Sequence, residues 1–155
     1  MNYRLYQLAD FEPLYAIEEA CFQPPLRFPR GYMRRLVNST KAATWIAEDN
    51  NHLAGFAIVE WSADEFSTVA YIQTLEVAQD QRGHGVGTEL LRRMESSAQQ
   101  QGASLIWLHV DAENAGAIRI YEAHGYRFEG REENYYARSR DALIYAKRLS
   151  EAADH

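Results

Sequence analysis

The stretch Val77–Leu91, VAQDQRGHGVGTELL, decides the fold of this chain. It predicts the end of a strand, then a glycine-rich turn, then an amphipathic helix. Glycine permits positive φ and leaves room for a ligand to touch the backbone. The turn contains Gly83, Gly85 and Gly87. Successive N–H groups in such a turn, with the positive end of the following helix, bind a phosphate or pyrophosphate. Arg82 and His84 add side-chain donors to it.

Two well-known anion-binding loops do not match this stretch. The ATP-type loop requires Gly-Lys-Ser/Thr, whereas Gly87 is followed by Thr88 and Glu89. The dinucleotide pattern GxGxxG starting at Gly83 has Thr88 in place of its last glycine. Taken alone, the stretch is compatible both with an anion-binding loop and with a tight turn that binds nothing.

Downstream of the turn, helices and strands alternate. Asn114 is the predicted cap of the second of these helices, and Gly125 is its stop. The apolar run SLIWLHV is typical of a strand that is covered on both faces. The predicted elements are a helix from Val86 to Gly102, a strand over 104–110, a helix over 115–124, and closing strands over 126–130 and 142–148.

Upstream of the turn, the pattern predicts mostly antiparallel sheet preceded by two helices. Asp10 is expected to cap the first helix, with Pro13 tolerated in its first turn. The prolines of QPPLRFPRGY forbid a regular helix and predict an irregular connection. The predicted elements are a strand over 3–8, helices from Asp10 to Phe22 and over 31–38, and strands over 43–48, 53–61 and 68–77. Together the two halves predict an α+β domain with a mixed sheet.

Composition narrows the class of protein. A chain of 155 residues suits one domain and buries enough surface to fold without disulfides or a metal. The net charge of −6 argues against nucleic acid and anionic membranes as partners. The single cysteine, Cys21, excludes an internal disulfide and suits a reducing cytoplasm. No run approaches the ~20 apolar residues of a membrane span, and we expect no signal peptide.

Two blocks of sequence resemble one enzyme superfamily. Arg82-x-x-Gly85-x-Gly87, between a strand and an amphipathic helix, is similar to the acetyl-CoA loop of the GNAT acetyltransferases. Asn114-Ala115-x-Ala117-Ile118-x-x-Tyr121-x-x-x-Gly125-Tyr126 is similar to their downstream CoA-binding helix. The resemblance implies a GNAT domain over 1–149 and a C-terminal tail over 150–155. Its fold is a mixed, mostly antiparallel central sheet flanked by helices, with two splayed strands forming the acetyl-CoA cleft.

The resemblance also implies a cosubstrate site. It assigns to acetyl-CoA the residues Leu75, Glu76, Val77, Arg82, Gly83, His84, Gly85, Val86, Gly87, Thr88, Asn114, Ala117 and Tyr121. A backbone N–H near Leu75–Val77 would stabilise the oxyanion. Tyr121 is expected to face the CoA sulfur as general acid, because a phenol can stabilise or protonate a thiolate. The alternative for Tyr121 is a helical aromatic packed on the sheet, since aromatics at helical spacing usually belong to the core.

The C-terminal part resembles the protein N-terminal acetyltransferase branch, which includes bacterial enzymes acting on ribosomal-protein N-termini. Asn134-Tyr135-Tyr136, followed by Asp141-Ala142 and a β-run, carries this resemblance. It implies that Tyr135 and Tyr136 hold an acceptor peptide. Phe28 and Tyr32, in and after the proline-rich connection, are expected to line the pocket of its first residue. An aromatic lid on the core and a rigid loop over the sheet are the alternatives.

The identity of the general base stays open between His109, acting with Tyr71, and Glu76. Bacterial relatives have WLEV where this chain has WLHV, so His109 stands in place of their proposed base. Some eukaryotic N-terminal acetyltransferases are more similar, with His on that strand and Tyr on the preceding one. Acting through water, a histidine of pKa ~6.5 suits an α-amine near ~7.7–8.0 better than a lysine near ~10.4. Glu76 is a candidate because its strand borders the cosubstrate.

The expected reaction is direct transfer of acetyl from acetyl-CoA to a primary amine in a ternary complex. A protein or peptide N-terminus is the expected acceptor, and the expected enzyme is a cytoplasmic monomer or homodimer. A small-molecule amine, such as a polyamine or amino acid, is one alternative, and a CoA-binding module without turnover is another. The histidines lack metal-ligand spacing such as HExxH and no GxSxG elbow occurs, so we expect neither a metal nor an acyl-enzyme.

Overall fold

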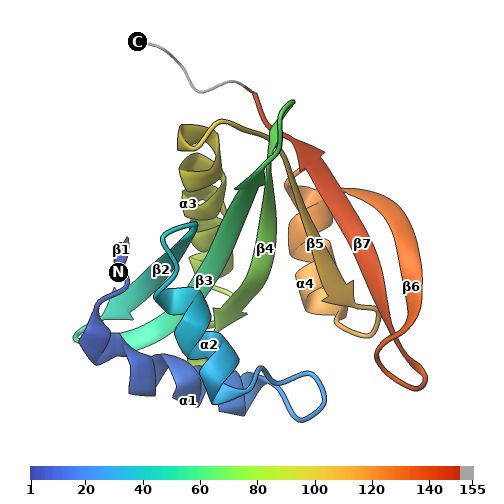
Figure 1. Cartoon of the computed structure of the whole chain (residues 1–155). Helices are drawn as coiled ribbons and strands as arrows, with labels where there is room; N and C mark the ends of the chain where they lie inside the picture. The colour runs from blue at the N-terminus through green and yellow to red at the C-terminus, as the bar shows by residue number, and fades with distance from the viewer. Residues whose placement is uncertain (151–155) are drawn as a thin grey trace.

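Seven strands form one sheet, in the order β1-β2-β3-β4-β5-β7-β6, in the computed structural model, which describes residues 1–150 (Figure 1). The strands are β1 (Asn2–Leu5), β2 (Ala42–Asp49), β3 (His52–Ala63), β4 (Thr68–Val77), β5 (Ala103–Asp111), β6 (Arg127–Ala137) and β7 (Arg140–Arg148). The helices are α1 (Phe11–Cys21), α2 (Arg30–Val37), α3 (Val86–Gln100) and α4 (Ala115–Ala123), with short 3-10 turns η1 (Leu8–Asp10) and η2 (Gln79–Gln81). All strand pairs are antiparallel except β4 with β5, so the predicted α+β class with a mixed, mostly antiparallel sheet is confirmed.

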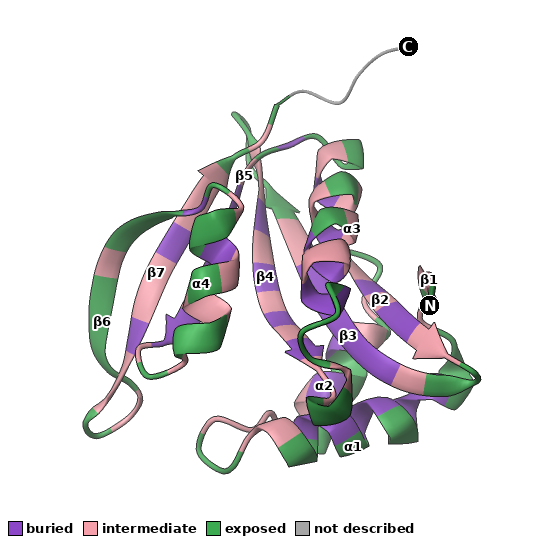
Figure 2. Cartoon of the chain, turned by 180° about the vertical axis from the view of Figure 1, so that it is seen from behind, coloured by how far each residue is buried: buried purple, intermediate pink, exposed green. Residues whose placement is uncertain are grey.

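The sheet has a hydrophobic core on each face, because successive side chains of a strand point to opposite sides. On β3, Phe56 and Ile58 pack against α1 and α2. Their neighbours Ala57 and Val59 belong to the larger core that α3 covers. Figure 2 shows the face that carries α3 and α4, with the buried side of α3 turned toward the sheet.

Helix α3 begins at the glycine-rich turn and packs along the sheet, as its apolar spacing predicts. Its buried residues include Val86, Leu90, Leu91, Met94 and Ala98. Gly102 adopts a φ of +82° just after the helix, which allows the chain to reverse into β5. This crossover connection places β5 parallel to β4.

Strands β4 and β5 pair over only part of their length. The pairing runs from Thr68 opposite Ala103 to Ile72 opposite Leu108, and then stops. Both strands continue, β4 to Val77 and β5 to Asp111, while β5 stays paired with β7. The predicted splay is therefore present, and Figure 1 shows the two strands diverging toward their carboxyl ends.

A β-bulge in β4 lies at the point of divergence. Val59 of β3 pairs with Ile72 and Ile58 pairs with Thr74, which leaves Gln73 as the extra residue. A bulge shifts the alternation by one, so residues an odd number apart can share a face. Tyr71 and Glu76, five positions apart, consequently both lie on the side of α1 and α2.

Several predicted boundaries differ from the structure. The first strand ends at Leu5 rather than residue 8, because η1 follows. Asp10 occupies the cap position of α1 but makes no side-chain cap bond to it. Its carboxylate instead accepts from Arg4 (2.8 and 2.9 Å) and from the Gln7 N–H (2.7 Å). The strand predicted over 126–130 runs from Arg127 to Ala137.

The predicted tail over 150–155 lies, apart from Ser150, outside the described residues. Within residues 1–150, no helix combines the length and apolar character needed to cross a membrane.

Gly55→Ala tests the close approach of β3 to β4. A Cβ at Gly55 would lie 2.5 Å from the Glu76 carbonyl oxygen and 3.2 Å from the Val77 Cα. Overpacking against backbone typically costs about 1–3 kcal/mol, and we expect a loss of that order in the free energy of unfolding, measured by urea denaturation. Gly130→Ala is the control, since a Cβ there meets nothing within 4 Å. Equal effects of the two substitutions would show that the close approach does not limit stability.

Candidate active site

The glycine-rich turn presents unpaired backbone N–H groups at the start of α3. Gly83 and Gly85 have φ of +82° and +80°, conformations that strain other residues. The Glu89 N–H makes the first helical bond, to the Gly85 carbonyl at 3.1 Å. The N–H groups that precede it in the helix, from Val86 to Thr88, therefore have no acceptor within α3. Together with the helix dipole, they suit a phosphate or pyrophosphate.

Arg82 is tied to the end of β4. Its Nε donates to the Val77 carbonyl at 3.0 Å, and its Nη2 contacts the Cys21 Sγ at 3.5 Å. A guanidinium has five N–H donors, so others remain available for an anion. The contact with Cys21 also joins the turn to the last residue of α1.

A cleft of about 890 Å³ extends from this turn along the open edge of β4 to α4. Its size suits a large organic ligand. Of the residues predicted for the cosubstrate, it is lined by Leu75, Glu76, Val77, Arg82, Gly83, Gly85, Val86, Gly87, Thr88, Asn114 and Ala117. Asn114 caps α4, since its side chain accepts from the Ala117 N–H at 3.1 Å. His84 is exposed and does not line the cleft.

The open edge of β4 offers a backbone donor to the cleft. The Val77 carbonyl points away from β3, because it accepts from Arg82. In a strand the N–H and C=O of one residue point to the same side, and residues two apart repeat that direction. The Leu75 N–H therefore points to the edge that β5 leaves uncovered.

A small cavity of about 80 Å³ lies between the cleft and a groove on the other side of the splay. It shares Phe22, Leu26, Leu75, Asp111, Asn114 and Ala117 with the cleft, and Phe28, Gln73, His109 and Tyr136 with the groove. Tyr121 lines this cavity but lines neither the cleft nor the groove. The cavity is thus the place where groups bound on the two sides can meet.

The groove has a volume of about 580 Å³ and is rich in aromatic side chains. It is lined by Phe28, Tyr32, Glu60, Trp61, Ser62, Val69, Tyr71, Gln73, Trp107, His109, Tyr135 and Tyr136. All four residues predicted to bind the acceptor are among them. Its lining includes the carboxylate of Glu60 but neither lysine nor arginine, so it suits a positively charged group.

The Asn134-Tyr135-Tyr136 motif positions its tyrosines through the β6–β7 turn. Asn134 adopts a φ of +57°, and its Oδ1 accepts from the Ser139 N–H at 2.7 Å. The Asn134 N–H in turn donates to Asp141 at 2.8 Å. Tyr135 and Tyr136 pack edge to face with ring centroids 4.9 Å apart. The Asn and Asp of the motif therefore shape the turn, while the tyrosines reach the groove.

His109 is held by three neighbours at the floor of the groove, and its side chain is only 8% exposed. Its Nδ1 lies 2.8 Å from the Tyr71 hydroxyl, so the predicted pairing of these residues is present. Its Nε2 lies 2.9 Å from Oε1 of Glu132. The Tyr135 ring stacks on the imidazole at 4.1 Å between centroids.

Burial raises the pKa of two site tyrosines. The pKa of Tyr71 is raised mainly by desolvation and further by its neighbour Tyr135. The pKa of Tyr121 is raised by desolvation and by the neighbouring Tyr136. Both phenols therefore remain protonated at neutral pH. Among residues 1–150, no hydrogen-bond partner engages the Tyr121 hydroxyl, which leaves it free for a ligand in the cavity.

Glu76 lies beside Glu18 of α1 rather than in contact with His109. Both carboxyls are almost fully buried, and Oε1 of each is the oxygen that no hydrogen bond within residues 1–150 engages. Desolvation and the neighbouring Glu18 carboxyl raise the pKa of Glu76 well above its ordinary value, and a proton on Glu76 would satisfy these two oxygens. Thr74 also donates to Glu76 Oε2 at 2.5 Å. The second oxygen of Glu18 accepts from the Phe28 N–H at 2.8 Å. A protonated Glu76 thus links β4, through Glu18, to the loop that carries Phe28.

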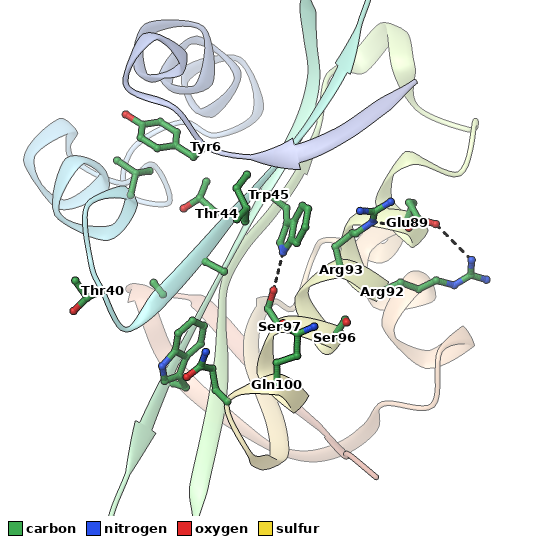
Figure 3. Close-up of a pocket in the computed structure, with 16 residues that line it drawn as sticks. Tyr6, Thr40, Thr44, Trp45, Glu89, Arg92, Arg93, Ser96, Ser97 and Gln100 are labelled. Atoms are coloured by element: carbon green, nitrogen blue, oxygen red, sulfur yellow. Dashed lines mark hydrogen bonds and ion pairs between the residues drawn. The ribbon is translucent and has the colours of Figure 1, made fainter. Parts of the chain in front are cut away.

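Another hollow of about 860 Å³ lies between β2 and α3 (Figure 3). Two pairs of its polar side chains bond to each other: Trp45 Nε1 donates to Ser97 Oγ at 2.9 Å, and Glu89 pairs with Arg93 at 3.0 Å. Its lining shares Trp61 with that of the groove and includes none of the predicted site residues. It is therefore not the candidate site.

Sequence reasoning missed Glu18 and Glu132. Glu18 follows Ile17 on an amphipathic helix, and Glu132 stands beside Glu133 in a polar strand, so both patterns are typical of solvated charges. The sequence around Glu18 and Glu132 does not distinguish these residues from their exposed neighbours. Only the tertiary contacts do.

Glu76→Gln tests the buried carboxyl pair. Because the pKa of Glu76 is raised in the folded state, folding takes up a proton, and stability falls as pH rises from the ordinary value near ~4.3 toward the raised value. This loss amounts to at most about 1.4 kcal/mol per pH unit for one proton. A glutamine can donate to Glu18 without titrating, so we expect urea denaturation to show a weaker loss of stability between pH 5 and 8. Glu65→Gln, at an exposed position, should keep the wild-type slope; the same slope in Glu76→Gln would refute the shared proton.

The family model described as the acetyltransferase (GNAT) family matches residues 11–126. Among curated proteins, the ribosomal protein bS18-alanine N-acetyltransferase of Escherichia coli (strain K12) is 33% identical over 104 residues, 65% of this chain and 68% of that protein. Streptothricin acetyltransferase of Streptomyces lavendulae is 39% identical over 84 residues, 54% of this chain. That match spans only 43% of the length of the streptothricin enzyme.

Solved structures share the whole fold. Arabidopsis thaliana NAA60, solved in complex with a bisubstrate analogue, has a TM-score of 0.86 at 22% identity, covering 97% of this chain and 99% of that chain. The ribosomal-protein-S18-alanine N-acetyltransferase from Escherichia coli has a TM-score of 0.84 at 24% identity, covering 99% and 97%. The family match, the glycine-rich turn and the splayed strands agree, and the chain belongs to the GNAT acetyltransferase family.

Proposed function

We propose that this protein transfers acetyl from acetyl-CoA directly to the α-amino group of a protein or peptide N-terminus. One observation carries the proposal: the small cavity at the splay shares lining residues with the cleft below the glycine-rich turn on one side and with the aromatic groove on the other. A thioester in the cleft and an amine in the groove would meet there without a covalent enzyme intermediate. NAA60 and the NatC complex, which share the fold, were solved with a bisubstrate analogue and with CoA and a peptide, which supports a ternary complex.

Acetyl-CoA is the proposed cosubstrate, and the residues present fit it. The free N–H groups of the turn and Arg82 would hold its pyrophosphate. The Leu75 N–H, on the uncovered edge of β4, would donate to the thioester oxygen as it gains negative charge. Tyr121 would lie nearest the sulfur.

Tyr121 would act by hydrogen bonding more than by full proton transfer. A thiol has a pKa near ~8.5, below even an ordinary phenol near ~10, and burial raises the pKa of Tyr121 further. Donating its whole proton to the thiolate is therefore uphill. A hydrogen bond to the developing negative charge still stabilises the leaving group.

Tyr71 and His109 are the proposed base. The Tyr71 oxygen would accept the amine proton while its own proton passes to His109. Because the pKa of Tyr71 is raised, its ionised form is too scarce at neutral pH to act alone, so the two transfers must be coupled. Glu76 would serve instead as a structural acid, since its carboxyl is occupied by Glu18 and Thr74.

The acceptor proposal rests on the groove and on the relatives. The tyrosines of β6 and the side chains of Phe28 and Tyr32 offer an extended, apolar surface suited to a peptide end. The bS18-alanine N-acetyltransferase supports a protein N-terminus as acceptor. A small cationic amine is the second candidate, favoured by the match to streptothricin acetyltransferase and by the carboxylate of Glu60 in the groove. We further propose a cytoplasmic enzyme whose GNAT domain covers residues 1–149.

Thiol release from acetyl-CoA tests the function directly. Short peptides with free N-termini, the same peptides with blocked N-termini but a free lysine, polyamines and free amino acids should be compared by kcat/KM. We expect the free N-terminal peptides to give the highest value. A preference for polyamines or amino acids would establish the second candidate, and CoA binding without acetylation of any amine would leave only a binding module.

Tyr121→Phe should lower kcat by about 10- to 100-fold, since it removes one hydrogen bond to the leaving group at a buried position. The KM for acetyl-CoA should stay nearly constant, because the turn and Arg82 hold the cosubstrate. Tyr126→Phe is a matched control: its hydroxyl bonds to Glu95 (2.7 Å), and its ring packs against Tyr121. An unchanged kcat in Tyr121→Phe contradicts the assigned role.

Tyr71→Phe should lower kcat by a similar factor, because the phenol links the amine to His109. Tyr32→Phe, which removes another hydroxyl from the groove, should mainly raise the KM of the peptide. Steady-state kinetics with a saturating peptide separates these effects. If both substitutions act only on KM, Tyr71 binds the acceptor and carries no proton.

A further inference from the structure

Glu132 determines which nitrogen of His109 carries the proton. An ionised carboxylate can only accept hydrogen bonds, so the nitrogen facing it must be the donor. Glu132 Oε1 lies 2.9 Å from Nε2, which places the proton of the neutral imidazole there. The lone pair is then on Nδ1, 2.8 Å from the Tyr71 hydroxyl. Tyr71 therefore donates to His109, and its oxygen keeps a free lone pair for an amine.

We propose that Glu132 is a positioning residue for the base, completing a Tyr71–His109–Glu132 relay. This proposal rests on the proposed acetyl transfer. Glu132 selects the histidine tautomer that can take the Tyr71 proton, and its negative charge stabilises the imidazolium formed when it does. Glu132 lies outside the lining of the groove and the cavity, so it acts through His109 alone.

The surroundings favour a specific role over a chance surface contact. The imidazole ring is fixed on one side by the stacked Tyr135 and packs against Trp107, with centroids 5.2 Å apart. Glu132 is anchored by the pairing of its backbone with Ala142 on β7. The side chain of His109 is 8% exposed while that of Glu132 is 48% exposed, so the pair links a nearly buried ring to solvent.

Bonds and protons balance over one catalytic turnover. The amine nitrogen forms a bond to the acetyl carbon, and the bond from that carbon to sulfur breaks. The amine proton passes to the Tyr71 oxygen as the Tyr71 proton passes to Nδ1, leaving an imidazolium beside Glu132 and a thiolate beside Tyr121. The imidazolium then returns its Nδ1 proton to solvent, and the thiolate takes a proton from solvent.

Glu132→Gln is the decisive variant because it keeps the shape of the side chain. A glutamine amide can either accept from Nε2 or donate to it, so it no longer selects one tautomer. We expect kcat to fall about tenfold, the lower end for residues that orient a reacting group through another, because Glu132 is partly solvated. KM for peptide and acetyl-CoA should stay within about twofold, since Glu132 touches neither site.

The matched control is Glu133→Gln, which makes the same charge change one residue along β6. Glu133 is exposed, and no hydrogen bond or ion pair of its side chain occurs within residues 1–150. It should retain the wild-type kcat. Equal losses in both variants would assign the effect to net charge and overturn the relay.

Nitrogen NMR of His109 gives a readout that does not depend on turnover. In the wild-type protein near neutral pH, the neutral imidazole should show a protonated Nε2 and a bare Nδ1; in Glu132→Gln, both tautomers should appear. A wild-type imidazole protonated at Nδ1, or an unchanged tautomer together with an unchanged kcat in the variant, would overturn the proposal. If the wild-type protein acetylates no amine, the proposed function fails, whereas the tautomer still tests the contact with Glu132.

Discussion

The site depends on the loss of pairing between β4 and β5 after Ile72. Up to that residue the two strands satisfy each other's backbone groups; beyond it, the edge of β4 is uncovered inside the molecule. Uncovered N–H groups in a protected place are costly unless a ligand or water bonds to them. The uncovered edge is therefore suited to binding a ligand. The cleft, the small cavity and the groove all lie along the gap that the divergence opens.

The bulge at Gln73 decides which side chains line that gap. By shifting the alternation of β4, it brings Tyr71 and Glu76 to one side and turns Leu75 and Val77 toward the α3 core. A strict alternation would separate Tyr71 from Glu76. The bulge lies where the pairing with β5 ends, so one irregularity in one strand places both Tyr71 beside His109 and Glu76 beside Glu18.

The sequence predicted the architecture well because its signals are local. The spacing of apolar residues, the glycines after helices and the turn residues between strands each report a short stretch of backbone. The same locality explains the errors. Asp10 was predicted as a helix cap, but Arg4, which β1 brings alongside, engages its carboxylate. Strand β6 is long because it pairs with β7. A short stretch of sequence does not include both partners of that pairing, so it could not predict the length.

Side-chain partnerships were the least predictable part of the site. Tyr71 and His109 are 38 positions apart, and only the resemblance to a family paired them. Glu18 and Glu76 meet across α1 and β4, and Glu132 reaches His109 from β6. The carboxylates of Glu18 and Glu132 stand in patterns typical of solvated charges, and only the fold brings them to Glu76 and His109. Runs of charged residues in a sequence usually predict exposed side chains. This rule fails most often at functional sites, where charged groups are held in specific contacts.

The contact of Arg82 with the Val77 carbonyl and Cys21 has a consequence for ligand entry. Through it, the anion-binding turn, the end of β4 and the last turn of α1 meet at one side chain. Glu18, three residues before Cys21, holds the loop that carries Phe28. A ligand that draws Arg82 toward its phosphates changes the support at the end of α1, and α1 in turn supports the wall of the groove. A ligand held at the turn and a second ligand held in the groove would therefore be coupled through α1.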